Sequence, residues 1–372
     1  MMTKHMYFRL FLALFAALMI PGPRALCQSG AIEPPTTAFS NDMPVATMKS
    51  LNEIEPRTLI SQLPFEIKEP GSYYVSPPPH QPLLAPIGTN GITISSGGVR
   101  LDLNGFVLID TNSTGWDAIC INNGQCIDVV IRNGVIDGWG GFGINAGAPE
   151  ITIADVKVVR NKKGGIYTGD NAHIVNCSAY GNGSGAVPPW DDGINAGPYS
   201  TISDCKARGN HGANIHGQWH CRITGCTATA SGNANGIFVE DFCTVRDCDV
   251  SCNLKCGIRV GSACRVIENT CSQNGTNMAQ PDAGILVQGT NSIVQGNLVC
   301  GNGQGIFTSG SGNLIINNAA SKNGGPPQDY MYGPGMNFSN FMGTATTLNA
   351  AGGSGGPFSN SNPWANFSFT SP

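Results

Sequence analysis

The stretch that decides the fold is residues 236–260, which read GIFVEDFCTVRDCDVSCNLKCGIRV. It begins and ends with the same kind of phrase, Gly236-Ile237-Phe238-Val239 and then Gly257-Ile258-Arg259-Val260, 21 residues later. Similar phrases recur along the middle of the chain, with gaps of 22, 28, 21, 22, 21, 27 and 21 residues. Their isoleucines are Ile144, Ile166, Ile194, Ile215, Ile237, Ile258, Ile285 and Ile306. Such a period is typical of a solenoid, in which each unit stacks on its neighbours to bury a shared core.

Each unit contains two strand-like segments. In the first, the isoleucine and the residue two positions later share one face, which indicates a half-buried strand. The second segment carries one core residue per unit: Ile153, Ile174, Ile202, Ile223, Val245, Val266, Val294 and Ile315. Two strands and two turns in about 21 residues leave no room for a crossover helix, so we predict an all-β coil.

Two further columns accompany the strands. One lies three residues after the second-strand core residue: Cys177, Cys205, Cys226, Cys248, Asn269, Asn297 and Asn318. The other closes each unit: Asn161, Asn182, Asn210, Asn233, Asn253, Asn274, Asn302 and Asn323. Because stacked strands lie about 4.8 Å apart, like side chains in one column touch, and we expect asparagine amides to hydrogen-bond along it.

The Gly-Ile strands, the Cys/Asn column and the Gly-Asn turns resemble the right-handed parallel β-helix proteins of the pectate-lyase-like superfamily. The resemblance covers roughly residues 90–324. Within that superfamily, the start (Pro56-Arg57 and Pro70-Gly71-Ser72-Tyr73-Tyr74) and the end (Asn362-Pro363-Trp364-Ala365-Asn366-Phe367) are similar to a group of exported bacterial proteins. The resemblance implies a single-stranded right-handed parallel β-helix of about ten coils with terminal caps. Its members include polysaccharide lyases, glycoside hydrolases, uronate epimerases and non-catalytic proteins.

The N-terminal segment predicts export. Lys4 and Arg9 flank an apolar run at residues 10–20, which is too short to span a membrane, and Ala25-Leu26-Cys27 is a suitable cleavage site. Alternatives are a buried N-terminal helix or a lipid anchor at Cys27. The predicted organisation is a signal peptide (1–27), a Pro-rich linker (28–56), an N-terminal cap (57–90), the β-helix (91–324) and a C-terminal Gly/Asn/aromatic cap or tail (325–372). We therefore expect a secreted or periplasmic protein.

Composition excludes several classes of protein. Hydrophobic residues make up 41% of the chain and charged residues only 12%, which argues against disorder. Removing residues 1–27 leaves 17 basic and 24 acidic residues, a net charge of −7. That balance does not suit nucleic-acid binding. No other run is apolar enough for a transmembrane segment, and we expect a monomer.

The 14 cysteines occupy positions where stacked core residues belong. A second column, Cys221, Cys243 and Cys264, repeats the pattern. Parallel, in-register side chains rarely meet the torsion that a disulfide requires, so we expect mostly buried free thiols. Metal binding by Cys252 and Cys256 lacks a second ligand pair.

Function on a solenoid usually lies where loops are inserted. The two long units contain extra segments at residues 183–192 and 276–282, and both precede a Gly-Ile strand. We predict a groove between these loops that is roughly four coil spacings, or about 19 Å, long.

The residues one and three positions after each isoleucine form the predicted floor of this groove. The candidate substrate-binding residues are Trp190, Asn195, Gln218, Trp219 and Phe238, and the candidate catalytic residues are Asp191, Asp192, His216, Glu240 and Arg259. Aromatic faces suit sugar rings, so a polysaccharide is the expected partner.

Two chemistries remain open for these residues. A uronate lyase or epimerase would use His216 or Arg259 as a base, with Ca²⁺ held by Asp191 and Asp192. A hydrolase would need a carboxylate pair, for which Asp191 or Asp192 with Glu240 is the candidate. Asp191-Asp192-Gly193-Ile194 is similar to the Asp-Asp motif of polygalacturonase-type hydrolases, but His211-Gly212 and His216-Gly217 are out of register for the partner motif.

Structural explanations exist for the same residues. Asp191 and Asp192 can form a solvated loop, Glu240 and Arg259 a surface ion pair, and Phe238 and Trp219 can pack under the loops. Whether the protein is an enzyme therefore stays open. The main alternative to an enzyme is a non-catalytic envelope or extracellular solenoid that binds glycan or protein. Metal delivery is a further alternative, although the sequence shows no metal motif.

Overall fold

The computed structural model describes residues 56–324, except His80, Pro86, 122–123, 185–190 and 276–281, together with residues 329–332, 344–345 and 366–369 and two short N-terminal strands. The chain divides into two units, Met1–Pro56 and Arg57–Pro372. In the first unit, β1 (Phe39–Ser40) pairs antiparallel with β2 (Met43–Pro44).

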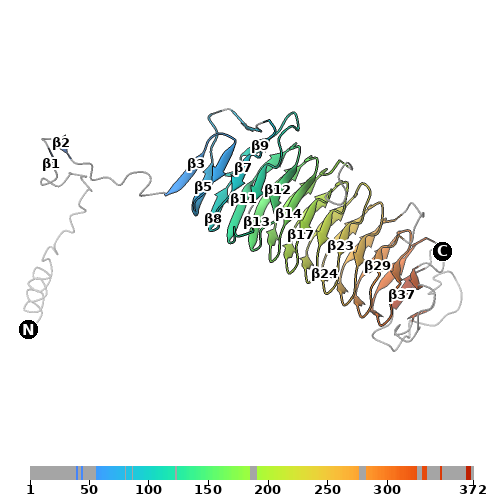
Figure 1. Ribbon diagram of the computed structural model, residues 1–372. Helices are drawn as coiled ribbons and strands as arrows, with labels where there is room; N and C mark the ends of the chain where they lie inside the picture. Colours follow the sequence, from blue (N-terminus) through green and yellow to red (C-terminus); the bar gives the residue numbers. More distant parts are fainter. Residues whose placement is uncertain are drawn as a thin grey trace, which may run out of the picture. The chain divides into compact units, whose positions relative to one another are not determined.

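The second unit is a parallel β-helix whose coils follow one another in chain order (Figure 1). The Gly-Ile phrases form one parallel sheet of twelve strands, which we call the Gly-Ile sheet. Its strands are β4 (Phe65–Ile67), β7 (Ile92–Ile94), β10 (Ile119–Ile121), β12 (Phe142–Ala146), β14 (Gly164–Thr168), β17 (Ile194–Ala196), β20 (Ile215–Gly217), β23 (Ile237–Val239), β26 (Ile258–Val260), β29 (Ile285–Val287), β32 (Ile306–Thr308) and β35 (Tyr330–Tyr332).

The isoleucines of this sheet pair directly with one another, from Ile194 through Ile215 and Ile237 to Ile258 and Ile285. All five are fully buried. A one-residue slip would turn every one of them to the outside, so this register is strongly specified by burial.

The remaining strands line the other sides of the coil. They are β3 (Arg57–Ile60), β5 (Gly71–Val75), β6 (Leu83–Leu84), β8 (Val99–Asp102), β9 (Val107–Ile109), β11 (Val129–Asp137), β13 (Ile151–Val159), β15 (His173–Val175), β16 (Ser178–Tyr180), β18 (Thr201–Ser203), β19 (Lys206–Arg208), β21 (Arg222–Thr224), β22 (Thr227–Thr229), β24 (Thr244–Arg246), β25 (Asp249–Ser251), β27 (Arg265–Ile267), β28 (Thr270–Ser272), β30 (Ile293–Gln295), β31 (Leu298–Cys300), β33 (Leu314–Ile316), β34 (Ala319–Ser321), β36 (Thr344–Ala345) and β37 (Asn366–Phe369).

Coils from β14 to β34 therefore contain three short strands, where the sequence predicted two. The additional strand presents one residue to the core, a small alanine in β19 and a valine in β25. Residues 57–90, predicted as a cap, supply β3 to β6, and β4 continues the Gly-Ile sheet beneath β7. Among the residues that the structure describes, no helix has the length and apolarity needed to cross a membrane.

Asparagines at the end of each coil form a buried ladder, which we call the closing ladder. Asn274 donates from Nδ2 to Asn302 Oδ1 at 2.9 Å and accepts at its own Oδ1 from Asn253 Nδ2 at 2.9 Å. The glycine of the Gly-Ile phrase makes room for it: a Cβ on Gly257 would lie 2.7 Å from Asn274 Nδ2. The phrase and the ladder are thus one packing unit.

The prediction that Asn233 belongs to this ladder is wrong, because Asn233 is exposed. Ser231 occupies the position, and its backbone N–H donates to Asn253 Oδ1 at 3.0 Å. The missing amide is supplied by Asn214, which donates to Asn253 Oδ1 at 2.9 Å and accepts from Asn210 Nδ2 at 2.8 Å.

The cysteines of the β-helix are free thiols, as predicted. Of the 13 cysteines in the described residues, 11 are buried, Cys300 is partly exposed and Cys252 is exposed. Neighbours in a column interact by hydrogen bonds rather than by a covalent bond, as in the backbone N–H of Cys221, which lies 3.2 Å from Cys243 Sγ.

Candidate functional site

The residues that directly follow the Gly-Ile isoleucines lie side by side on the outside of the sheet. This outer column runs Asn195, His216, Phe238, Arg259 and Leu286 in direct register. The rings of His216 and Phe238 are 4.7 Å apart, and the Arg259 guanidinium lies 4.9 Å from the Phe238 ring centre. Arg259 also donates two hydrogen bonds to Gln288 Oε1, at 3.0 and 2.7 Å. The structure therefore brings together residues from five coils that the sequence placed on one floor.

Asp192 forms hydrogen bonds both within its own coil and with the coil that follows. Its Oδ1 accepts from the Ala213 backbone N–H at 2.7 Å, and its Oδ2 accepts from Asn195 Nδ2 at 2.8 Å. The same Oδ2 lies 3.0 Å from His216 Nδ1. Because a carboxylate can only accept, we assign the imidazole proton to Nδ1. His216 Nε2 is then an acceptor, and this buried atom has no hydrogen-bond partner.

Asp191 is buried beside Asp192 and contacts a different histidine. Its Oδ2 lies 3.4 Å from His211 Nδ1, whereas its Oδ1 is buried without a partner. Asn195 Oδ1 is likewise buried and unpaired. A buried acceptor without a donor costs roughly 1–3 kcal/mol, so three such atoms around Asp192 mark this region as unusual.

The hydrogen bonds of Asp192 also have a structural precedent in this chain. Asp117 precedes Ile119 as Asp192 precedes Ile194, and its oxygens accept from Phe142 N at 2.7 Å and Asn145 Nδ2 at 2.8 Å. An acceptor at this position ties each coil to the next one. What distinguishes Asp192 is the histidine that takes the place of Asn145 in the following coil.

The calcium site predicted at Asp191 and Asp192 has little support in this geometry. Asp192 already uses three of its roughly four acceptor positions within the protein. In the described part of the chain, no group of three or more His, Cys, Asp or Glu side chains is placed to bind a metal ion. Calcium binding stays a prediction.

The proposed carboxylate pair is disfavoured. Asp192 lies before β17 and Glu240 follows β23, two coils away, at the opposite end of the strand column. Two coil spacings alone separate their backbones by about 10 Å, whereas hydrolase pairs lie roughly 5–9.5 Å apart. The alternative explanation of Glu240 and Arg259 as a surface ion pair is not what the structure has, because the Arg259 guanidinium donates to Gln288 Oε1.

The other predicted residues lie at the margins of the column. Gln218 and Trp219 follow β20, and Trp219 is 56% exposed in the turn. Trp190 lies outside the described residues, as do most of the two inserted segments that were predicted to wall the groove.

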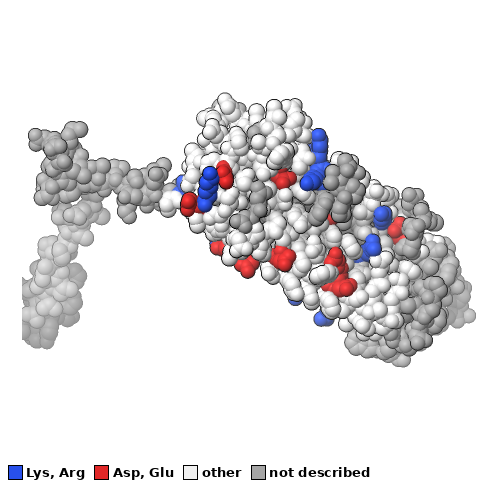
Figure 2. Space-filling view, viewed as in Figure 1, with Lys and Arg blue, Asp and Glu red and all other residues white. Residues whose placement is uncertain are grey.

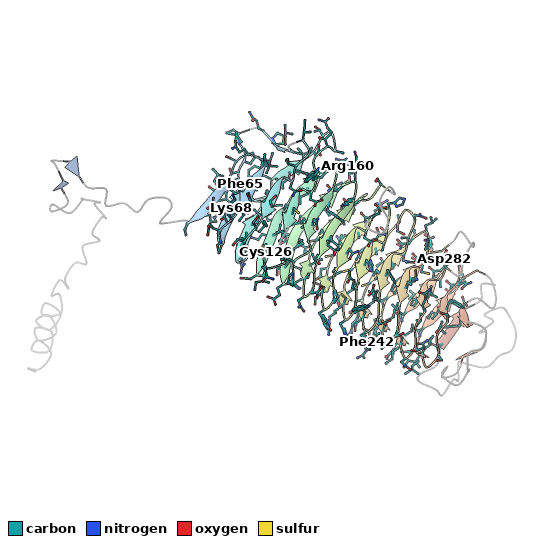
Figure 3. The ribbon with its side chains drawn as sticks, in the orientation of Figure 1. Phe65, Lys68, Cys126, Arg160, Phe242 and Asp282 are labelled. Carbon is teal, nitrogen blue, oxygen red and sulfur yellow. The ribbon has the colours of Figure 1, made fainter. Side chains whose placement is uncertain are left out.

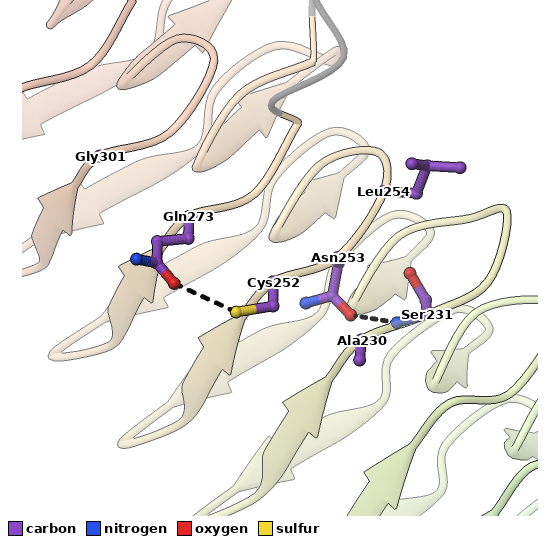
Figure 4. A pocket seen from close by; sticks show the side chains of 7 residues that line it. All are labelled: Ala230, Ser231, Cys252, Asn253, Leu254, Gln273 and Gly301. Atoms are coloured by element: carbon purple, nitrogen blue, oxygen red, sulfur yellow. Dashed lines mark hydrogen bonds between the residues drawn. The ribbon is translucent and has the colours of Figure 1, made fainter.

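The sequence did not indicate a shallow pocket on another side of the coil (Figure 4). It has a volume of about 540 Å³ and is lined by Ala230, Ser231, Cys252, Asn253, Leu254, Gln273 and Gly301. The Cys252 thiol donates to Gln273 Oε1 at 3.3 Å.

Comparisons with known proteins define the class to which this fold belongs. The A-module of the mannuronan C-5 epimerase AlgE4 of Azotobacter vinelandii is similar in structure, with a TM-score of 0.52 and 15% identity over 72% of this chain and 88% of that one. The Dettilon tailspike protein has a TM-score of 0.50 and 13% identity over 84% of this chain, which spans 61% of the tailspike. The protein therefore has the right-handed parallel β-helix fold of the pectate-lyase-like proteins.

At the level of sequence, residues 191–329 match the family described as periplasmic copper-binding protein (NosD). No curated protein sequence matches the chain.

Proposed function

We propose that this is an exported β-helix protein that binds a polysaccharide along the outer column. The observation that carries the proposal is the continuous contact from His216 through Phe238 to Arg259 and Gln288. An aromatic ring beside amide and guanidinium donors offers both the apolar surface and the hydrogen bonds that sugar rings need.

The comparisons add support of two kinds. The similar mannuronan epimerase is named for a polysaccharide, so a related fold holds such a polymer. The matched family is described as periplasmic, which agrees with the predicted signal peptide. That description also names copper binding. The described residues include no group of three or more His, Cys, Asp or Glu side chains placed to bind a metal ion, so copper is not proposed as a ligand here.

The outer column can bind an acidic polymer although the protein as a whole carries the same sign of charge. The net charge is negative, but Arg259 offers a local positive group on the column itself. On the face shown in Figure 2, basic side chains are scattered rather than gathered into a patch. This distribution suits recognition of single carboxylates better than binding of a densely charged nucleic acid.

A second candidate function is modification of a bound uronate, and the Asp192–His216 hydrogen bond favours it. A carboxylate that holds the imidazole proton at Nδ1 leaves Nε2 as the acceptor that a base for C5 of a uronate needs. Because Nε2 is buried in this structure, this candidate also requires a side-chain movement that exposes it to the sugar. This would make the protein a lyase or an epimerase.

One set of measurements tests both candidates. Uronate and neutral polysaccharides are screened for binding, with and without Ca²⁺, and the products are examined for unsaturated or epimerised sugars. We expect Phe238→Ala to weaken binding about two- to tenfold, since one aromatic contact is worth roughly 0.5–1.5 kcal/mol. Phe307→Ala, one coil beyond the end of the outer column at Leu286, is the matched control and should bind as the wild type does.

For the enzyme candidate, His216→Gln should lower turnover about a hundredfold or more. Binding without any product from any polymer would leave a non-catalytic solenoid. Equal binding by wild type and Phe238→Ala would contradict the proposed surface itself.

A further inference from the structure

A second column of side chains runs along the turn that follows the Gly-Ile strands. Each coil there has one residue in the left-handed backbone conformation, and each such N–H donates to the next coil, as Phe242 N does to Ser262 O at 2.8 Å. We call it the turn column: Asn171, Tyr199, His220, Phe242, Ala263 and Asn291, with φ between 54° and 61°. Phe242 projects from one edge of the solenoid and Asp282, beside an inserted segment, from the other (Figure 3).

Three consecutive members of the turn column are aromatic rings that stack in parallel. Tyr199 and His220 lie 4.8 Å apart with an interplanar angle of 4°, and His220 and Phe242 lie 4.8 Å apart at 9°. Despite this stacking, Tyr199 is 59% exposed and Phe242 57% exposed. Trp219, also exposed, precedes His220 in the same turn.

Bulky rings are an unfavourable choice for this backbone. Glycine and asparagine adopt positive φ most readily, and Asn171 and Asn291 occupy the column below and above the rings. Three rings at such positions add little buried apolar surface to the core, because more than half of Tyr199 and of Phe242 is in solvent. The ring surface itself therefore needs an explanation.

The stack stops abruptly at Ala263. The next coil thus places only a methyl group above Phe242, and Asn291 follows one coil further on. Since coils are about 4.8 Å apart, Phe242 and Asn291 are separated by roughly 10 Å. A single ring over Ala263 would lie one coil spacing from each, in continuation of the stack.

Polar residues directly precede the members of the turn column and are bonded to the coil that follows. The backbone N–H of Ser262 donates to Asp241 Oδ1 at 2.6 Å, and Ser262 Oγ accepts from Thr290 N at 3.2 Å. Asp241 and Ser262 thus place a carboxylate and a hydroxyl one residue before Phe242 and Ala263, and Asn291 places an amide in the turn column itself. A pyranose matches that pattern, because it has an apolar face of C–H groups and a rim of hydroxyls.

We propose that the opening over Ala263, between Phe242 and Asn291, binds one sugar ring of a glycan, stacked on Phe242. A second copy of this chain is a poorer occupant. The four exposed side chains Tyr199, Trp219, His220 and Phe242 offer at most about 400 Å², taking roughly half of about 200 Å² for each, whereas a stable dimer buries about 800 Å² per partner. The site does not depend on the outer column being a ligand site.

The test uses variants that fill or remove the opening in the full-length protein. Ala263→Phe adds the fourth ring and occupies the opening, and Phe242→Ala removes its floor. Asn171→Phe is the matched control, because it lengthens the stack below Tyr199 and leaves the opening free. Binding of cello-, malto-, chito- and galacturono-hexasaccharides is measured by saturation-transfer NMR and titration, with circular dichroism to establish that each variant is folded.

We expect at least one hexasaccharide to bind the wild type and Asn171→Phe equally, and to bind Ala263→Phe and Phe242→Ala at least tenfold more weakly. Loss of this binding in Phe238→Ala together with its retention in Ala263→Phe would overturn the proposal and place the sugar on the outer column instead, which distinguishes the two sites. Equal binding by Ala263→Phe and wild type would overturn the proposal, as would failure of all four sugars to bind. Dimerisation of the wild type that Ala263→Phe abolishes would overturn it in favour of a second copy.

Discussion

At the scale of single residues, the asparagines of the closing ladder add buried side-chain hydrogen bonds between consecutive coils. Asn274 receives hydrogen bonds from Asn253 N and Nδ2 and donates to Val250 O and Asn302 Oδ1, all between 2.9 and 3.1 Å. Asn274→Ala would leave these buried groups unpaired, and we expect it to lower the free energy of unfolding by about 3 kcal/mol. Denaturant titration measures this, with the exposed Asn233→Ala as control, expected to change stability by less than about 0.5 kcal/mol. Equal losses in the two variants would contradict the ladder.

The same residues show which part of the ladder could be predicted from the sequence. The spacing of asparagines predicted the ladder but selected Asn233, because Ser231 is not an asparagine. The sequence does contain a signal for the compensation. Asn214 precedes Ile215 where other coils have glycine, and this is the coil in which Ser231 replaces the ladder asparagine. An amide from one side of the turn compensates for its loss on the other. The bond between Asp192 and His216 could not be predicted, since it depends on side-chain direction rather than on spacing.

At the scale of elements, buried thiols pack inside the coils beside the isoleucines, as Cys271 does, and Cys256 packs with Ala283 and Leu286 in a separate buried cluster. Burial raises the pKa of Cys256 from 9.0 to about 11, and burial also raises the pKa of Cys271. These thiols stay protonated in the folded state while the unfolded chain ionises, so their contribution is complete below pH 9 and is lost as pH rises toward 11. We expect the free energy of unfolding to fall by about 1.4 kcal/mol per pH unit for each such thiol in that window.

Denaturant titrations between pH 8 and pH 11 measure this slope, and Cys256→Ala isolates the part due to one thiol. The variant should show a shallower fall than the wild type over the same range. Alkylation of the folded protein should reach the exposed Cys252 and spare Cys256. Identical slopes, or rapid alkylation of Cys256, would contradict burial of a neutral thiol.

The strands of the Gly-Ile sheet could be predicted from the sequence, whereas the third strand of each coil could not, and the reason is physical. Strands such as β23 carry isoleucine and valine on one face, so alternation identified them. Among the missed strands, β16, β19 and β22 each turn one alanine inward, as in Lys206-Ala207-Arg208, and β25, β28 and β31 each turn one valine or cysteine inward. Three residues with a single side chain on the core face carry no periodic signal, although the coil needs them to close its third side.

At the scale of the whole molecule, a β-helix must protect the open strand edges at its ends. In the second unit, β35 pairs with β32 and β37 pairs with β34. Asn366 extends the ladder of the Cys/Asn column: its Oδ1 accepts from the backbone N–H and Nδ2 of Asn318, both at 3.0 Å. Its own Nδ2 donates to Ile315 O at 2.7 Å.

A chain ending after Gly324 would expose the edges of β32 and β34 together, along with the unpaired amide of Asn318. Exposed parallel edges recruit other chains, so we expect this truncation to associate increasingly with concentration in sedimentation velocity, whereas the full chain does not. Asn366→Ala, which keeps the strand and removes only the amide, should remain monodisperse but unfold at a lower temperature, because Asn318 loses its acceptor. A truncated chain that stays monodisperse at every concentration would show that the edges are protected by something other than β35 and β37.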